Sequence, residues 1–139
     1  MSYVKVWIHA VWATKKREKC LTRDIRDVIF KHIHQNALDK GIYMDSASGS
    51  SEHVHCLFRI RNDQMIQDVM RMIKGESSHW INKHNLIGRK FAWQKEYLTI
   101  SVSESQVKGV RKYVQEQQAH HTRRTFKEEY DDLLKRMGF

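Results

Sequence analysis

The sequence predicts an α+β domain, an antiparallel sheet with helices on one face, and three observations lead to this prediction. Residues 3–13 and 53–60 have the alternating apolar pattern or the density of β-forming residues that is typical of strands. Three other segments place apolar residues at helical spacing. Strand-like and helical segments alternate along the 139 residues without a linker. We therefore expect a single domain over residues 1–139.

The first half of the chain predicts a strand, a helix and two more strands. Apolar residues recur at every second position of residues 3–13, at Val4, Val6, Ile8, Ala10 and Trp12. Thr22 is expected to cap a helix that ends at Gly41, with apolar positions Ile25, Val28, Ile29, Ile33 and Ala37. Residues 42–49 are a strand candidate, followed by a serine-rich turn and the strand 53–60.

The second half predicts two helices around one strand, and then a short helix. The first helix runs from Ile66 to before Gly88, and residues 91–102 are strand-like with a kink near Glu96. The next helix starts at Ser103 or Ser105, and a short helix is expected around 130–137. This order is the split βαβ arrangement of ferredoxin-like and RRM-like domains, with an added C-terminal helix. It leaves the second face of the sheet free for a partner or a second subunit.

The charge balance indicates a polyanionic partner. Twenty-five Lys and Arg residues against sixteen Asp and Glu residues give a formal net charge of +9. Neutralising phosphates releases condensed counterions, which favours binding of nucleic acid. No apolar run approaches the roughly 20 residues that a membrane span needs, so we expect no membrane association. Cys20 and Cys56 lack a paired spacing and indicate reduced thiols in a cytoplasmic protein.

The first candidate site is the pair His53 and His55. Residues two apart on a strand point to the same face, so both imidazoles can reach one metal ion while Val54 enters the core. His32 and His34 have the same spacing but lie in a predicted helix. Two positions on a helix are about 200° apart, so that pair cannot share an ion. A solvated or hydrogen-bonded histidine pair is the alternative reading of His53 and His55.

The second candidate site is Tyr113 with Gln117, four residues apart on the third helix. Four-residue spacing places both side chains on one helix face, beside the apolar stripe of Val107, Val110 and Val114. They would then stand at the border of the buried seam, where a side chain can reach a cleft. The alternative is a tyrosine that packs at the helix border with Gln117 in water.

Together these residues predict metal-assisted phosphoryl chemistry. Two imidazoles and an amide oxygen form a mixed nitrogen and oxygen site that suits Mg²⁺ or Mn²⁺ better than structural zinc. Such an ion polarises a phosphate oxygen and stabilises a leaving group. The phenol of Tyr113 must lose its proton to attack, and a neighbouring cation makes this easier.

The two patterns together resemble a known family. His53-Val54-His55 resembles the HUH signature of single-tyrosine transposases from the smallest bacterial insertion sequences, and residues 113–117 resemble their tyrosine-and-glutamine motif. Residues 91–95, 101–103 and 118–121, with Phe126 and Glu129 beyond them, are also similar to that family. The resemblance covers nearly the whole chain. Ser51-Glu52 stands where the family has Pro-Asp.

The resemblance implies an activity and a set of roles. It implies a DNA transposase that binds hairpins in single-stranded DNA, cuts beside them and rejoins the strands. Tyr113 would be the nucleophile that keeps the 5′ end as a phosphotyrosine, with a free 3′-OH for strand transfer, and His53, His55 and Gln117 would hold the metal. It also implies a homodimer joined sheet edge to edge, in which the tyrosine of one subunit can complete the metal site of the other.

Basic residues are the candidate DNA contacts. They group after the first strand, on the second helix and near the tyrosine: Lys15, Lys16, Arg17, Arg71, Lys74, Arg111, Lys112, Arg123 and Arg124. Two alternatives stay open. One is a domesticated relative that processes repeated hairpins, and the other is a non-catalytic nucleic-acid-binding module. The second lacks support from the central strands, which have no aromatic-rich pattern for stacking bases.

Overall fold

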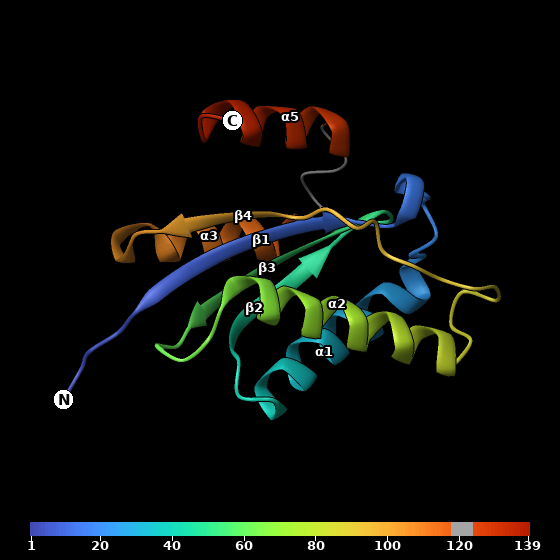
Figure 1. The fold of residues 1–139 in the computed structure, drawn as a ribbon. Helices are drawn as coiled ribbons and strands as arrows, with labels where there is room; N and C mark the ends of the chain where they lie inside the picture. Colours follow the sequence, from blue (N-terminus) through green and yellow to red (C-terminus); the bar gives the residue numbers. More distant parts are fainter. Residues whose placement is uncertain (118–123) are drawn as a thin grey trace.

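A four-stranded antiparallel sheet forms the centre of the computed structural model, which describes residues 1–117 and 124–139 (Figure 1). The strands are β1 (Val6–Ala13), β2 (Tyr43–Gly49), β3 (His53–Ile60) and β4 (Leu98–Val102), in the order β2-β3-β1-β4. Every pairing is antiparallel. The predicted α+β, split βαβ fold is confirmed, and β1 and β3 are the central strands that carry the site.

The main core lies between the sheet and the helices α1 (Arg23–Asp39) and α2 (Ile66–Lys83) (Figure 1). The stripe Ile8, Ala10 and Trp12 of β1 points into this core, as period two requires. Val54, Cys56 and Phe58 of β3 join it, along with Ile29, Ile33, Val69, Met70 and Ile73 from the helices. The predicted inward position of Val54 is therefore confirmed.

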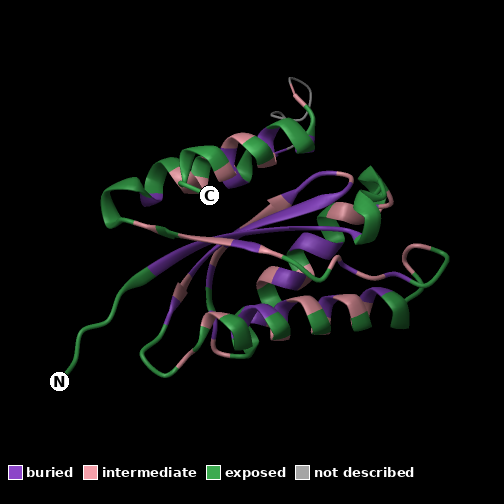
Figure 2. Cartoon of the chain, turned by 45° about the horizontal axis from the view of Figure 1, so that its top comes forward, coloured by how far each residue is buried: buried purple, intermediate pink, exposed green. Residues whose placement is uncertain are grey.

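The second face of the sheet is covered, and the expectation that it stays free is wrong. The helices α3 (Val107–Gln115) and α5 (Phe126–Arg136) pack on it from the side opposite α1 and α2 (Figure 1). Val11, Ala13, Leu98, Phe126 and Leu133 form one cluster there, and Trp7, Leu57, Val107 and Val114 form another. The central strands are apolar on both faces, so leaving one face in water would expose a large apolar area. Figure 2 shows the resulting burial of β1 and β3 on both sides.

The helix α3 ends earlier than predicted: it stops at Gln115, so Gln117 lies just beyond it rather than on it. Two further element boundaries also differ from the sequence prediction. Only 98–102 of the expected strand 91–102 is a strand; Trp93 makes an isolated bridge with Thr14 and donates its indole N–H to Ser77. The final helix begins at Phe126 rather than near residue 130, because the hydroxyl of Thr125 accepts the N–H of Glu128 and caps the first turn. Both changes place buried aromatic rings, which alternation alone does not reveal.

The helical pair His32 and His34 diverges, as predicted. The ring of His32 stacks on Trp80 at 3.8 Å between centroids, and its Nε2 lies 2.8 Å from a carboxylate oxygen of Glu76. The Nε2 of His34 instead faces the carbonyl oxygen of Met44 at 2.9 Å. Each ring therefore has its own structural partner.

In the described parts of the chain, none of the helices combines the length and the apolar character that crossing a bilayer requires. Cys20 and Cys56 are both free thiols, and Cys56 is buried.

Gly49 at the end of β2 has no room for a side chain. A Cβ there would lie 2.1 Å from the carbonyl oxygen of His53 and 3.0 Å from the ring of Phe30. Gly49→Ala should therefore lower the free energy of unfolding by about 1–3 kcal/mol, measured by urea denaturation. Gly75→Ala is the matched control, since Gly75 lies within α2 with nothing near its Cβ, and it should stabilise by about 0.5–1 kcal/mol. Equal stabilities of the two variants would contradict the packing argument.

Candidate active site

The central strand β3 delivers two histidines to the second face of the sheet. His53 and His55 alternate with Val54 and Cys56, which point into the main core. Both imidazoles are fully buried under the helices of that face. Burial of two polar rings is costly unless their nitrogens find partners, so their contacts define the site.

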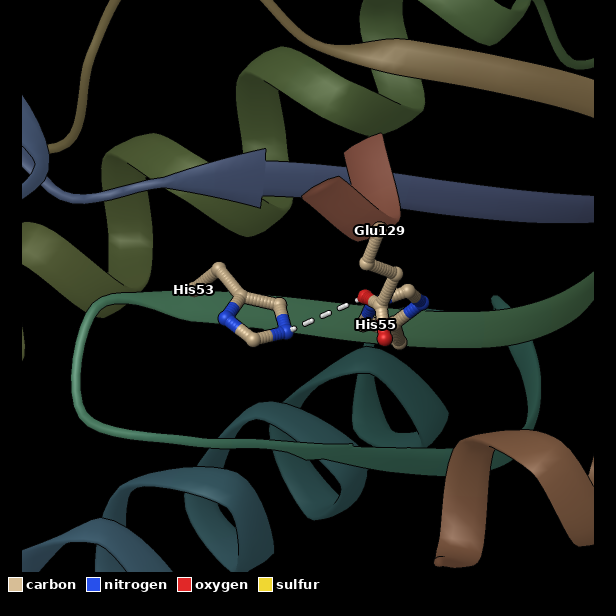
Figure 3. A group of neighbouring side chains, drawn as sticks. All are labelled: His53, His55 and Glu129. Atoms are coloured by element: carbon tan, nitrogen blue, oxygen red, sulfur yellow. Dashed lines mark hydrogen bonds and ion pairs between the residues drawn. The ribbon is translucent and has the colours of Figure 1, made fainter. Parts of the chain in front are cut away.

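Glu129 on α5 is the partner that contacts both imidazoles, and sequence reasoning assigned it no metal role. One carboxylate oxygen of Glu129 lies 2.9 Å from Nε2 of His55 and 3.6 Å from Nε2 of His53 (Figure 3). Glu129 is 1% exposed, although it is charged. The three residues each present one donor atom, and these atoms lie within 4.8 Å of one another.

A signal for Glu129 does exist in the sequence. Phe126, Tyr130 and Leu133 recur at helical spacing, and Glu129 lies on the same face of α5 as these residues. A carboxylate on an apolar helix face needs a buried partner. The sequence does not say which partner, because that depends on how α5 lies on the sheet.

Gln117 and Tyr113 also reach this centre. The Oε1 atom of Gln117 lies 3.0 Å from Nε2 of His53, and its Nε2 donates to the carbonyl oxygen of Tyr113 at 3.3 Å. Gln117 is fully buried. The ring centroid of Tyr113 lies 5.6 Å from that of His55. The structure thus brings together all four residues singled out as the predicted centre, and does so within one chain.

The electrostatics of the site couple Tyr113 to Glu129. Burial, the charge of Glu129 and a hydrogen bond with it raise the pKa of Tyr113 to about 12, against smaller opposing effects of Gln117 and Arg124. Burial alone would raise the pKa of Glu129, but the hydrogen bond from His55 and the nearby imidazoles outweigh it and hold that pKa at about 2. Burial lowers the pKa of His55 to about 3. At neutral pH the site therefore combines a carboxylate with a neutral His55 ring and a protonated phenol.

The Nδ1 atom of each imidazole, on the opposite side of the ring from the Nε2 that faces Glu129 or Gln117, also has a partner. Nδ1 of His53 lies 2.9 Å from the hydroxyl of Ser50 and 3.2 Å from a carboxylate oxygen of Glu52. Nδ1 of His55 lies 2.8 Å from Nε2 of His9. Both rings therefore turn their Nε2 atoms toward Glu129 and Gln117, as ligating histidines whose Nδ1 atoms have such partners do.

The donor set fits a divalent cation. Bonds of about 2.1 Å at right angles place neighbouring donor atoms roughly 3 Å apart. Two separations here, 2.9 Å for His55 and Glu129 and 3.0 Å for His53 and Gln117, match this spacing, while His53 and Glu129 are farther apart, at 3.6 Å. Two imidazoles, a carboxylate and an amide oxygen form a mixed nitrogen and oxygen set that can hold Mg²⁺ or Mn²⁺, and they include no thiolate of a structural zinc site. The carboxylate strengthens this expectation beyond what the three predicted ligands supply.

The predicted DNA contacts fall into two groups. Lys15, Lys16 and Lys112 are exposed, and Arg71 is exposed beside Asp68. Lys15 and Lys16 line a cavity of about 330 Å³ together with Lys90, Arg89 and Glu18. Sequence reasoning missed Lys90 and Arg89, and Arg89 forms an ion pair with Glu18. This cavity adjoins the end of β1, where Ala13 pairs with His53.

The other basic residues are engaged within the protein. The ammonium of Lys74 donates to the carbonyls of Gln94 and Lys95 at 2.8 Å and so holds the segment before β4 against α2. Arg111 forms a two-pronged ion pair with Asp45 on β2.

Arg17 and Arg124 also have contacts at α5. The guanidinium of Arg17 lies 5.1 Å from the centre of the Phe126 ring. Arg124 is 3.6 Å from Asp132. Arg123 lies outside the described residues, as do residues 118–121 of the family-like run.

Comparisons with known proteins identify the class of this chain. The sequence model of the IS200-like transposases matches residues 2–117, so the chain belongs to that family. A curated relative, the ISDra2 transposase TnpA of Deinococcus radiodurans, is 25% identical over 115 residues, which are 78% of this chain and 81% of the relative.

Two solved structures share the fold. A crystal structure of a transposase candidate from Deinococcus radiodurans R1 has a TM-score of 0.67 at 23% identity, over 84% of this chain and 95% of the other. The structure of a REP-associated tyrosine transposase bound to a REP hairpin has a TM-score of 0.61 at 19% identity, over 87% and 72% of the two chains. The resemblance to transposases drawn from the sequence is therefore confirmed at the level of family and fold.

Glu129 should contribute to metal affinity. Glu129→Gln removes the negative charge but keeps the shape, and it should weaken Mn²⁺ binding at least tenfold, measured by electron paramagnetic resonance titration. Glu128→Gln is the matched control, because Glu128 is exposed on the same helix turn. Unchanged or tighter Mn²⁺ binding by Glu129→Gln would show that the carboxylate is no ligand.

Proposed function

We propose that this chain is a transposase that cuts and rejoins single-stranded DNA through a phosphotyrosine link at Tyr113, with a divalent cation held by His53, His55, Gln117 and Glu129. Family membership supports transposition as the process. The observation that supports the proposed chemistry is the position of Tyr113, whose ring lies 5.6 Å from that of His55 beside the candidate metal ligands. A phenol beside buried imidazoles and a carboxylate is an arrangement suited to attack on a phosphate.

The reaction balances as follows. The Oη atom of Tyr113 attacks the scissile phosphorus, a bond from Oη to phosphorus forms, and the bond from phosphorus to the 3′ oxygen breaks. The phenolic proton passes from Tyr113 to water, and water gives a proton to the departing 3′ oxygen, which becomes a hydroxyl, so no net proton is released or consumed. The number of phosphoester bonds is conserved, so a 3′-OH can later displace Tyr113 without an added energy source.

The residues of this chain have distinct tasks in that scheme. Gln117 ties the centre to the tyrosine helix, since its amide bridges His53 and the Tyr113 carbonyl. The raised pKa of Tyr113 keeps the phenol protonated while the carboxylate beside it is unneutralised. A bound divalent cation supplies Lewis acidity to the scissile phosphate and offsets the Glu129 charge that raises this pKa.

The proposed substrate is a hairpin in single-stranded DNA. The net charge of +9 and the cavity lined by Lys15, Lys16 and Lys90, near the end of β1 that pairs with His53, support binding of a polyanion there. The fold that this chain shares with a hairpin-bound transposase supports a hairpin as the form of that DNA. We place the reaction in the cytoplasm, consistent with two free thiols.

A homodimer remains part of this proposal, with one modification. Both edges of the sheet, β2 and β4, are strand edges through which a second copy can pair. Tyr113 lies beside the histidines of its own chain, so the proposed cut does not require a tyrosine from a partner.

Tyr113→Phe should abolish the covalent link. Wild-type protein with Mg²⁺ and labelled hairpin DNA from the flanking genome should give a shifted protein–DNA band on a denaturing gel, and Tyr113→Phe should give none. Tyr130→Phe is the control, because Tyr130 packs on the neighbouring helix α5 against Phe126. A shifted band from Tyr113→Phe, or none from wild type despite tight binding, would refute the proposed nucleophile or the proposed cleavage.

The basic turn should contribute phosphate contacts. For single-stranded DNA, each lost contact reduces the slope of log affinity against log salt by about 0.7, so the double change Lys15→Ala and Lys16→Ala should lower it by about 1.4. The measurement is fluorescence anisotropy between about 50 and 200 mM salt. Lys74→Ala should leave the slope unchanged, since its ammonium is engaged by backbone carbonyls. The same slope for wild type and the double variant would remove the turn from the interface.

A further inference from the structure

His9 is a third histidine on the buried second face, and nothing in the motifs singles it out. It lies on β1 opposite Leu57, one diagonal step from His55, which pairs with Val11. It is 5% exposed, and its ring stacks on that of His55 at 5.1 Å between centroids and 30° between planes. Its neighbours on this face of the strand, Val11 and Ala13, are apolar. A polar ring at this position is costly unless a partner matches it.

The partner is the Nδ1 atom of a candidate ligand. Nε2 of His9 lies 2.8 Å from Nδ1 of His55. A histidine that binds a cation through Nε2 must present a lone pair there, so its proton sits on Nδ1. That N–H can then donate to Nε2 of His9, which must accept and therefore holds its own proton on Nδ1. The direction of this hydrogen bond, from His55 to His9, follows because Nε2 of His55 must keep its lone pair for the cation.

The alternative tautomer blocks the site. If Nε2 of His55 holds the proton, it donates to Glu129 at 2.9 Å, and its lone pair faces His9 instead. The same two rings can therefore exist in a closed pairing, with the proton toward Glu129, and an open pairing, with the proton toward His9. His9 can pair with either tautomer, and a cation on Nε2 of His55 selects the open one. An apolar residue at this position would leave the Nδ1–H of the open pairing buried without an acceptor.

We propose that His9 is a positioning residue that holds His55 in its cation-binding tautomer, because Nε2 of His9 accepts a hydrogen bond from the Nδ1–H of that ring. The proposal rests on the proposed metal centre. It makes His9 the counterpart, for His55, of Ser50 and Glu52, which contact Nδ1 of His53. Residues on or next to β1 and β3 then contact the Nδ1 atoms of the two imidazoles, while α5 supplies Glu129 on the Nε2 side. Outer partners of this kind commonly contribute 10–100-fold to metal affinity.

Two substitutions separate positioning from packing. His9→Phe keeps the ring and removes the acceptor, and a neighbouring cavity of about 420 Å³ leaves room for the slightly larger side chain. His9→Gln keeps an acceptor near the position of Nε2. We expect Mn²⁺ affinity, measured by electron paramagnetic resonance titration, to fall about 10–100-fold in His9→Phe and to stay within about threefold of wild type in His9→Gln.

A matched control tests whether any buried change near the centre has this effect. Cys56→Ala alters a fully buried neighbour of His55 that points to the opposite face of β3. It should leave Mn²⁺ affinity unchanged. Wild-type affinity in His9→Phe, or equal losses in His9→Phe and Cys56→Ala, would overturn the proposal.

A second measurement needs no variant. Imidazole ¹⁵N correlation spectra of the Mg²⁺-loaded wild type should show the His55 proton on Nδ1 and the His9 proton on Nδ1. A His55 proton on Nε2 in that sample would overturn the proposal even if His9→Phe fails to fold. Failure of the proposed metal centre is distinguishable, because wild type would then bind no Mn²⁺. If wild type binds Mn²⁺ and His9→Phe binds it equally well, the inference alone fails.

Discussion

The contact between Glu129 and the two histidines is the constraint on which the second half of this structure depends. A carboxylate that is 1% exposed is stable there because His55 and His53 face it. Because His55 is neutral there, the carboxylate depends on a hydrogen bond, and a hydrogen bond to a charged group commonly contributes about 1.5–3 kcal/mol. This contact therefore sets where α5 lies on the sheet. With α5 in that position, Phe126 stacks on His53 at 4.1 Å, and the second face closes.

Closure of this face gives the site its electrostatic character. Burial lowers the pKa of His55 and of His9, so both rings favour the neutral form, which can bind a cation or accept a hydrogen bond. The same burial raises the pKa of Tyr113 and couples the phenol to Glu129. Two oppositely shifted groups beside each other are typical of sites that move protons. A cation or a substrate that alters the charge at Glu129 therefore also alters the pKa of the Tyr113 phenol.

The sheet and the site follow from the sequence to different extents. Alternation along β1 and β3 predicts which residues face the main core, and the spacing of His53 and His55 predicts that both leave the other face. The spacing of Tyr113 and Gln117 predicts a shared face of one helix. The structure instead ends α3 at Gln115, and Gln117 reaches His53 from just beyond that end. The strand 91–102 is shorter than predicted, because Trp93 and Lys74 engage its first half in side-chain contacts that alternation does not encode.

By itself, the sequence determined the α+β class and the order of the elements. It also predicted that the candidate catalytic and metal-binding residues lie in two segments, residues 53–55 and 113–117, because periodicity is a local property of the chain. Only the tertiary structure decided that Glu129 and His9 contact His55, that Lys74 and Arg111 are engaged in the protein, and that Tyr113 lies beside the histidines of its own chain. These facts depend on how α3 and α5 pack against β1 and β3. Contacts between residues 46 to 74 positions apart are set by that packing and have no local signature.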